Sequence, residues 1–102
     1  MNFKYVYILT NDNLNVVYTG STGDLKQRVY QQKTRLIEGF TKKYNVQRLV
    51  YFERFSSIAD AIHREREIKG YRRSKKNALI SKMNHEWCDL YQGLKESLKD
   101  IA

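Results

Sequence analysis

The chain has 102 residues, with 19 Lys and Arg against 11 Asp and Glu, which gives a formal net charge of +8. This length suits one domain, and no apolar stretch approaches the ~20 residues that a membrane-spanning helix needs. The single cysteine, Cys88, excludes an internal disulfide, and the N-terminus lacks the apolar core of a signal peptide. We therefore expect a soluble, cytoplasmic protein whose excess of positive charge fits an anionic partner, nucleic acid before a membrane.

The first part of the chain predicts a β-hairpin and a helix. The hairpin consists of a strand over residues 4–10, a polar turn over residues 11–15 and a second strand over residues 16–19. Gly20 and Gly23 then interrupt the pattern, and Asp24 is a good N-cap for a helix from residue 25 to about residue 36. Residues 38–45 form a polar connection.

The second part predicts one more strand and further helices. The LVYF centre of residues 47–55 indicates the strand. The helices are expected over residues 58–69, 75–83 and 86–98. Ser56 or Ser57 suits the first N-cap, Gly70 ends that helix, and Ser74 suits the second N-cap.

The order β-β-α-β-α-α, with a further C-terminal helix, predicts an α/β fold of the α+β type, in which helices flank a small three-stranded antiparallel sheet. We expect a single domain over residues 1–92 and a frayed helical tail over residues 93–102.

Two helices carry polar side chains where their apolar stripes should continue. In the first, the stripe with helical spacing consists of Leu25, Arg28, Val29, Gln32 and Leu36. Either Arg28 extends its head group to water from a packed stem, or it faces a site. In the helix over residues 58–69, Glu65 lies near the middle of the stripe, whereas Arg64, Arg66 and Glu67 should be solvated.

A carboxylate at the position of Glu65 is costly unless it is paired, hydrogen-bonded or bound to a metal. One alternative is an internal salt bridge to Arg28, and another is that the stripe ends near a cleft. The third is that both groups meet in one cleft, together with Tyr7 and Tyr18 of the hairpin. Two phenols, a guanidinium and a carboxylate suit phosphodiester chemistry, because the guanidinium matches phosphate oxygens and the carboxylate can hold Mg²⁺.

The residues also resemble a known family. The tripeptide YVY at residues 5–7, followed by YTG at 18–20, is similar to the two-part signature of the GIY-YIG nuclease superfamily. Further segments match in order: L-x-x-R at 25–28, A-x-x-x-E-x-x-I-K at 61–69, YRRSKK at 71–76 and MNHEWCDLY at 83–91. This set resembles the small stand-alone bacterial members called URI-type or UPF0213-like proteins.

The resemblance implies a Mg²⁺- or Mn²⁺-dependent endonuclease. By motif, Tyr7 would orient or deprotonate the attacking water, and Tyr18 would contact the phosphate. Arg28 would bind the scissile phosphate, and Glu65 would be the protein ligand of the metal. Gly20 would allow close approach at the strand exit. The resemblance also associates Asn84 with a late asparagine near the site.

Two positions depart from the family pattern. Tyr5 replaces the first glycine of the signature, and we interpret it as a packing residue. Gln32 occupies a position where many relatives have histidine. Because glutamine cannot take up a proton near neutral pH, activity is expected to be slow or to depend on Tyr7 alone.

Basic residues outside the motif suggest a track for the nucleic-acid backbone. They are Lys42, Lys43, Arg72, Arg73, Lys75 and Lys76. Such charges bind phosphates without reading sequence, and the alternative is a solvated charge run. Several aromatic side chains are candidates for stacking on unpaired bases, although packing is an alternative role for them: Tyr30, Tyr44, Tyr71 and Trp87.

Three hypotheses follow. The first is an endonuclease that cuts DNA, in preference to RNA, by structure or strand, in repair or recombination. The second is a catalytically weak binding module for DNA or RNA on the same fold. The third is a basic protein associated with RNA or ribosomes that performs no chemistry. Glu65 favours the first over the third, since binding alone needs no carboxylate on that stripe. A partner protein could supply targeting, and the sequence does not give the oligomeric state.

Overall fold

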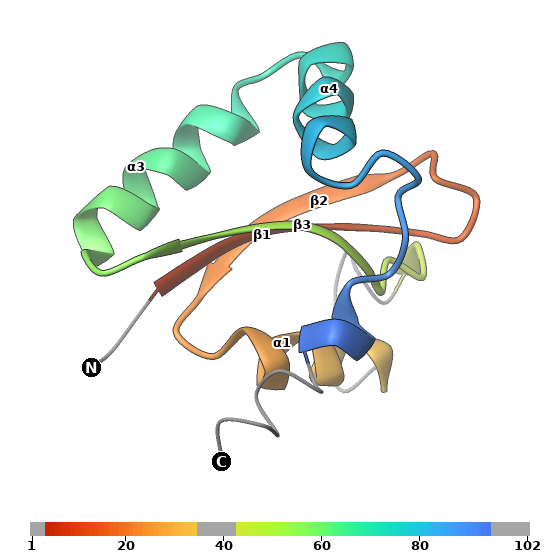
Figure 1. The fold of residues 1–102 in the computed structure, drawn as a ribbon, viewed down its shortest axis with the longest axis horizontal. Coiled ribbons are helices and arrows are strands. Elements are labelled where there is room, and N and C mark those ends of the chain that lie inside the picture. Colours follow the sequence, from red (N-terminus) through yellow and green to blue (C-terminus); the bar gives the residue numbers. More distant parts are fainter. Residues whose placement is uncertain (1–3, 35–42, 95–102) are drawn as a thin grey trace.

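The structure is a computed structural model and describes residues 4–34 and 43–94. Its elements are β1 (Lys4–Thr10), β2 (Val17–Thr22), α1 (Leu25–Lys33), β3 (Arg48–Phe55), α3 (Ile58–Lys69) and α4 (Arg73–Met83). The strands form one antiparallel sheet in the order β2-β1-β3. Helix α1 covers one face of this sheet, and α3 and α4 cover the other (Figure 1). The predicted α+β fold is confirmed.

A polar turn fixes the register of the β1–β2 hairpin. The Asn11 carboxamide oxygen accepts hydrogen bonds from the main-chain N–H groups of Asn15 and Val16, at 3.0 and 3.2 Å. Leu14 has a positive φ of 58° in this turn. The resulting register places Tyr7 opposite Gly20, and β2 continues to Thr22, three residues beyond its predicted end.

Alternation along the strands divides the core between the two faces. Toward α3 and α4, the sheet packs Val6, Ile8, Val50 and Tyr51 against Ala61, Ile68 and Ile80. Toward α1, it packs Tyr7, Leu9 and Leu49 against Leu25, Val29 and Val46. Both faces of β1 are therefore buried, as is typical of the central strand of a covered sheet.

The helix caps agree with the sequence at two of three starts. The Asp24 carboxylate accepts a hydrogen bond from the N–H of Gln27 at 3.0 Å, and the Ser57 hydroxyl accepts one from Asp60 at 3.3 Å. The prediction that Ser74 caps a helix is wrong. Helix α4 begins earlier, at Arg73, with Arg72 as an N-cap that makes no side-chain hydrogen bond.

The prediction of a helix over residues 86–98 is also wrong for the first part of that range. Residues 85–90 consist of turns and irregular chain, with Trp87 at a φ of 57°, and among the described residues after them only 91–94 are helical. The buried Asn84 carboxamide holds these turns: it donates to the carbonyls of Cys88 and Val50, at 2.7 and 3.2 Å, and accepts from the N–H of Cys88 at 3.1 Å. These bonds compete with helix formation.

Residues after the turns cover the outer edge of β3. The register between β1 and β3 shifts next to Leu49. The N–H of Leu49 donates to the Asp89 carboxylate at 3.2 Å, and its carbonyl accepts from the N–H of Leu90 at 2.8 Å. Lys33 of α1 forms an ion pair with Asp89, so the segment 89–94 lies beside α1 (Figure 1). Within the described residues, none of the helices has the length and apolarity to cross a membrane.

The boundary between domain and tail near residue 92 stays a prediction. It falls within the helical residues 91–94, and residues 95–102 lie outside the described part of the chain.

Candidate functional site

Tyr7 and Tyr18 meet above Gly20 on the α1 face of the sheet. Antiparallel pairing sets Tyr7 directly opposite Gly20, and the rings of the two tyrosines have centroids 6.3 Å apart at a 45° tilt. A Cβ atom added at Gly20 would lie 2.7 Å from the Tyr7 hydroxyl oxygen and 2.8 Å from its Cζ. The Tyr7 phenol therefore occupies the space that a side chain at residue 20 would fill.

The environment of Tyr7 brings the predicted residues into one electrostatic neighbourhood. The Tyr7 side chain is only 1% exposed, and this burial is the largest cause of a pKa raised above its ordinary value. The charges of Tyr18 and Glu65 raise the pKa further, while the Arg28 guanidinium lowers it. The four residues named from the sequence are thus close enough to interact, and Tyr7 is a neutral phenol at pH 7.

Helix α1 positions Arg28 at the border of the buried stripe. Leu25, Val29 and Gln32 of this helix are buried against the sheet, while Arg28 is half-buried. Gln32 is 6% exposed and belongs to the same buried stripe of α1. Its amide cannot accept a proton near neutral pH.

Helix α3 brings Glu65 to β2. Burial raises the pKa of the Glu65 carboxyl, but hydrogen bonds from Lys69 and Ser21, together with the charges of Lys69 and Lys4, outweigh it and hold the pKa below its ordinary value. The Lys69 ammonium lies 2.6 Å from the carboxylate, whose side chain is 18% exposed. Glu65 is therefore ionised at neutral pH, and its ion pair is with Lys69 rather than with Arg28.

The stripe around Glu65 is less apolar than its spacing predicted. Ala61 and Ile68 are buried, but Ile58 and Ile62 are exposed. Glu65 thus lies at the border of the packed face of α3.

A metal ion has one suitable carboxylate in this group. No set of three or more His, Cys, Asp and Glu side chains with metal-binding geometry occurs in the described ranges 4–34 and 43–94. Glu65 is ionised and offers hard oxygen donors, which fits a cation such as Mg²⁺ that keeps most of its water shell.

The remaining predicted residues lie elsewhere or are otherwise engaged. Both amide hydrogens of Asn84 are donated to main-chain carbonyls, which leaves its side chain with a structural role. Arg73 donates to the carbonyls of Leu14 and Asn15 in the β1–β2 turn, at 3.1 and 3.0 Å. The Lys75 ammonium lies 4.1 Å from the centroid of the Tyr71 ring.

Of the other predicted basic residues, Arg72 and Lys43 are exposed and Lys76 is half-buried. Lys42 lies outside the described residues.

Sequence reasoning missed two partners of Glu65 and a second polar cluster. Lys69 follows Glu65 at the i+4 spacing of a helical ion pair, a signal that could have been used. Ser21 lies on a strand distant in sequence, so no spacing pattern could have identified it as a partner of Glu65. The expectation that Arg64 is solvated is wrong: its guanidinium binds the Glu53 carboxylate at 3.0 Å and donates to the Tyr71 hydroxyl at 3.1 Å.

This cluster is structural in character. Burial and a hydrogen bond to Glu53 raise the pKa of Tyr51 to about 12, and Arg64 also pairs with Glu67. The cluster joins β3 to α3 on the face of the sheet opposite Tyr7.

Comparison with known proteins identifies the family to which the chain belongs. Residues 3–78 match the family model described as the GIY-YIG catalytic domain. The chain therefore belongs to the GIY-YIG family, whose domain is a nuclease fold.

Within that family the chain is similar to UPF0213 proteins. The one from Haloquadratum walsbyi is 36% identical over 78 residues, which is 76% of this chain and 86% of that protein. The one from Staphylococcus saprophyticus is 35% identical over 81 residues, 79% of this chain and 98% of that protein. The solution NMR structure of a UPF0213 protein from Bacillus halodurans superimposes with a TM-score of 0.50 at 33% identity, covering 78% of this chain and 83% of that one.

Proposed function

We propose that this protein is a metal-dependent endonuclease that hydrolyses phosphodiester bonds in DNA. The observation that carries the proposal is the position of Tyr7, a buried phenol that interacts with Tyr18, Arg28 and Glu65 at once. With no recognition helix among its motifs, the protein selects strand or structure rather than sequence, and acts in the cytoplasm in repair or recombination.

Arg28 binds the scissile phosphate. Its guanidinium projects from the border of the buried stripe of α1, where a phosphate can reach it and where half-burial strengthens the attraction. Tyr18, whose ring adjoins that of Tyr7, donates to the same phosphate. Because Gly20 has no side chain, the Tyr7 hydroxyl can occupy the space above residue 20.

Tyr7 orients the attacking water through its hydroxyl. Its raised pKa keeps the proton on the phenol at neutral pH, so the unloaded site contains no phenolate base. The Arg28 charge lowers this pKa and so partly offsets the effect of burial.

Glu65 would hold the metal, Mg²⁺ or Mn²⁺, through its ionised carboxylate, and the metal would neutralise charge at the leaving oxygen. Lys69 and Ser21 fix the carboxylate from two elements, so the ligand is held in place before the metal arrives.

A second candidate function is a nucleic-acid-binding module with weak catalysis. The observation in its favour is that Gln32, buried beside the site, cannot act as a base, while the pKa of Tyr7 is raised. Hydrolysis would then be slow at neutral pH and rise steeply with pH, whereas binding would be unaffected.

Cleavage of labelled DNA in Mg²⁺ separates these candidates. Single-stranded, duplex and branched substrates are incubated with wild type, Glu65→Ala and Tyr7→Phe. We expect a loss of at least about 100-fold in rate for each variant. Glu67→Ala, on the same helix and exposed, and Tyr5→Phe, on the same strand, are matched controls that should cut normally. If wild type cuts no substrate, the endonuclease assignment fails; if both site variants cut as well as wild type, the proposed site is wrong.

A further inference from the structure

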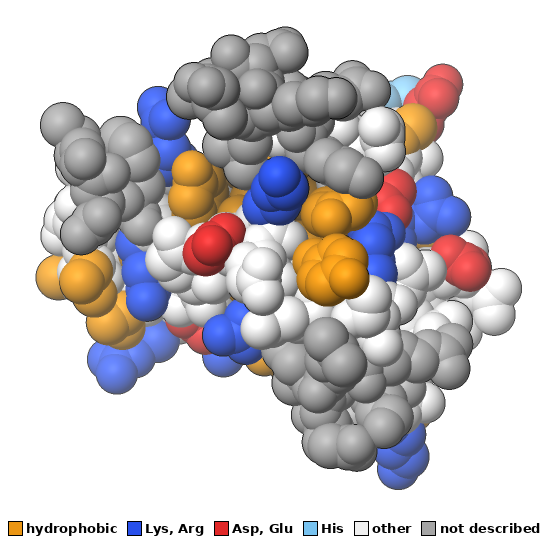
Figure 2. Space-filling view, turned by 90° about the horizontal axis from the view of Figure 1, so that it is seen from below, with side chains coloured by type: hydrophobic (Ala, Val, Ile, Leu, Met, Phe, Trp, Pro, Cys, Tyr) orange, Lys and Arg blue, Asp and Glu red, His pale blue; other side chains and the backbone are white. Residues whose placement is uncertain are grey.

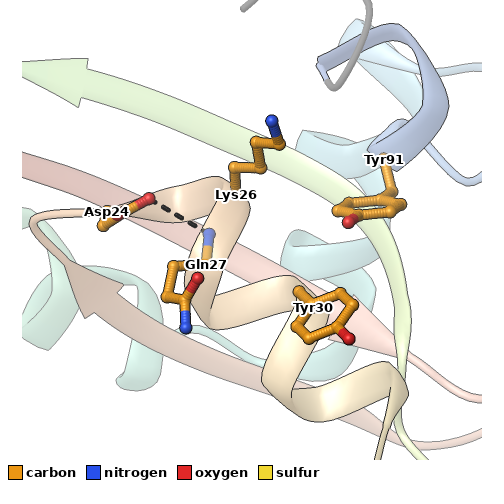
Figure 3. A pocket seen from close by; sticks show the side chains of 5 residues that line it. All are labelled: Asp24, Lys26, Gln27, Tyr30 and Tyr91. Atoms are coloured by element: carbon orange, nitrogen blue, oxygen red, sulfur yellow. Dashed lines mark hydrogen bonds between the residues drawn. The ribbon is translucent and has the colours of Figure 1, made fainter.

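A pocket lies along α1, outside the group formed by Tyr7, Tyr18, Arg28 and Glu65. Its volume is about 450 Å³, and it is lined by Asp24, Lys26, Gln27, Tyr30 and Tyr91. The first four come from α1 and its N-cap, and Tyr91 reaches the pocket from the C-terminal segment (Figure 3). This volume falls within the range of ~300–1,000 Å³ that is typical of small-ligand sites.

The two aromatic rings of the pocket are held from different parts of the fold. Tyr91 is fixed by the segment that covers β3: its N–H donates to the Asp89 carboxylate at 3.1 Å, and the Lys33 ammonium lies 5.2 Å from its ring centroid. Tyr30 projects from α1 and is 49% exposed. A ring that is already positioned loses little conformational freedom when a ligand stacks on it, which favours binding.

The charges in the pocket indicate which part of a nucleic acid it suits. Asp24 and Lys26 contribute one negative and one positive charge, and the Asp24 carboxylate already accepts a hydrogen bond from the N–H of Gln27. A phosphate would therefore gain no net attraction. A planar, uncharged heterocycle would gain stacking on the tyrosines, and the Gln27 amide offers it both a donor and an acceptor.

The position on α1 relates the pocket to the candidate active site. At 100° per residue, Lys26 and Tyr30 each lie about 200° around the helix from Arg28, so they project from roughly opposite sides of a cylinder about 10–12 Å wide. Seen from the α1 side of the sheet, basic and hydrophobic side chains adjoin one another in the middle of this face (Figure 2). A strand bound at Arg28 would have to pass around the helix to reach the pocket, and only an unpaired base could then enter it.

We propose that this pocket binds an unpaired nucleobase, stacked on Tyr30 and Tyr91, from a strand that leaves the site at Arg28. The inference rests on the proposed nuclease function, and it adds a substrate class: DNA with a single-stranded segment, such as a flap, a gap or a frayed end. The pocket would discriminate against intact duplex, since a paired base cannot enter it.

Fluorescence anisotropy tests the proposal with a labelled single-stranded oligonucleotide and a blunt duplex of the same sequence, in EDTA so that neither is cut. Tyr30→Ala should weaken binding of the single strand by roughly 5- to 20-fold, in the lower part of the range for one stacked base. Binding of the duplex should stay within about twofold of wild type, because phosphate contacts are retained. Tyr30→Phe keeps the ring and should bind the single strand as wild type does.

Two further variants make the result decisive. Tyr91→Leu should reproduce the effect of Tyr30→Ala, while Ile58→Ala, which removes an exposed apolar side chain outside the pocket, should have none. Circular dichroism and thermal melting establish that each variant is folded. Unchanged single-strand binding by both Tyr30→Ala and Tyr91→Leu overturns the proposal, as does an equal loss for duplex and single strand.

The same proteins distinguish failure of the pocket from failure of the nuclease assignment. If the tyrosine variants lose single-strand binding but wild type cuts no DNA, the pocket stands and the endonuclease assignment fails. If Glu65→Ala abolishes cleavage but the tyrosine variants bind normally, the pocket is wrong and the nuclease assignment stands.

Discussion

Gly20→Ala is expected to disturb both stability and chemistry, because the added methyl group would collide with Tyr7. The new Cβ would lie 2.7 Å from the Tyr7 hydroxyl oxygen and 2.8 Å from Cζ, whereas ordinary contacts begin at 3.4 Å. The ring must therefore move by about 0.6–0.7 Å, and it is almost fully buried, so it cannot turn into solvent. Overpacking of this kind costs about 1–3 kcal/mol.

The expected loss is measurable by thermal or urea unfolding. For a domain of this size, about 1–3 kcal/mol lowers Tm by roughly 4–8 °C per kcal/mol. The cleavage rate should fall by roughly 10- to 100-fold, because displacement of a catalytic group by less than 1 Å has effects of this order. Gly70→Ala is the matched control: its Cβ would make ordinary contacts of 3.5 and 3.6 Å, so Tm should be unchanged or slightly higher.

A double variant isolates the contact itself. Removing the hydroxyl with Tyr7→Phe relieves the shortest of the collisions, so Gly20→Ala should cost less when it is combined with Tyr7→Phe than when it is made in wild type. We expect a coupling free energy of at least about 0.5 kcal/mol, the usual size for residues in contact. Wild-type stability in Gly20→Ala, or strict additivity in the double variant, would refute the reasoning that the phenol occupies the space above Gly20.

Three other perturbations have definite expected outcomes. Lys69→Met should raise the pKa of the Glu65 carboxyl, seen by NMR titration, since burial, the largest effect, raises it and the main opposing partner is gone; an unchanged pKa would contradict the ion pair. In wild type the depressed pKa means that ionised Glu65 stabilises the fold above its unfolded-state pKa, and that this contribution is lost as the pH falls through the folded value. Asn84→Ala should lower the free energy of unfolding by about 2–3 kcal/mol in urea titrations, because it leaves buried main-chain groups without partners; a change below about 0.5 kcal/mol would show that water replaces the amide. Asp89→Ala should speed hydrogen exchange at the Leu90 amide by roughly tenfold or more, with little change at Val6. If the Leu90 amide exchanges as slowly in the variant as in wild type, the Lys33–Asp89 ion pair does not hold the segment 89–94 in place.

The sequence predicted the elements best where local chemistry decides them. The alternating run at residues 4–10 became β1 with the predicted bounds, and Asp24 and Ser57 start helices because their side chains accept from N–H groups three residues on. Helical spacing singled out Glu65 near the middle of the α3 stripe, although it lies at the border of the packed face, and the resemblance to the family was confirmed by the match over residues 3–78.

The errors arose where distant segments decide the outcome. Helix α4 starts before Ser74, in a first turn where Arg73 binds carbonyls of the β1–β2 turn, a contact that spans more than 50 residues of sequence. The chain after Asn84 turns instead of continuing as a helix, because that side chain binds β3 and the turn itself. Arg64 is drawn from solvent by Glu53 on another element. None of these partners can be identified from the spacing of residues along one helix.

The bonds between Leu49 and the segment 89–90 have a consequence for where this protein can be shortened. The match to the family ends at residue 78, so a chain cut there would retain every proposed catalytic residue. It would also end inside α4 and lose Asp89 and Leu90, which bond to the N–H and C=O of Leu49 on an outer strand of the sheet. Unpaired strand edges pair readily with other chains. The minimal catalytic unit is therefore expected to aggregate, and the smallest soluble unit to extend at least through Leu90.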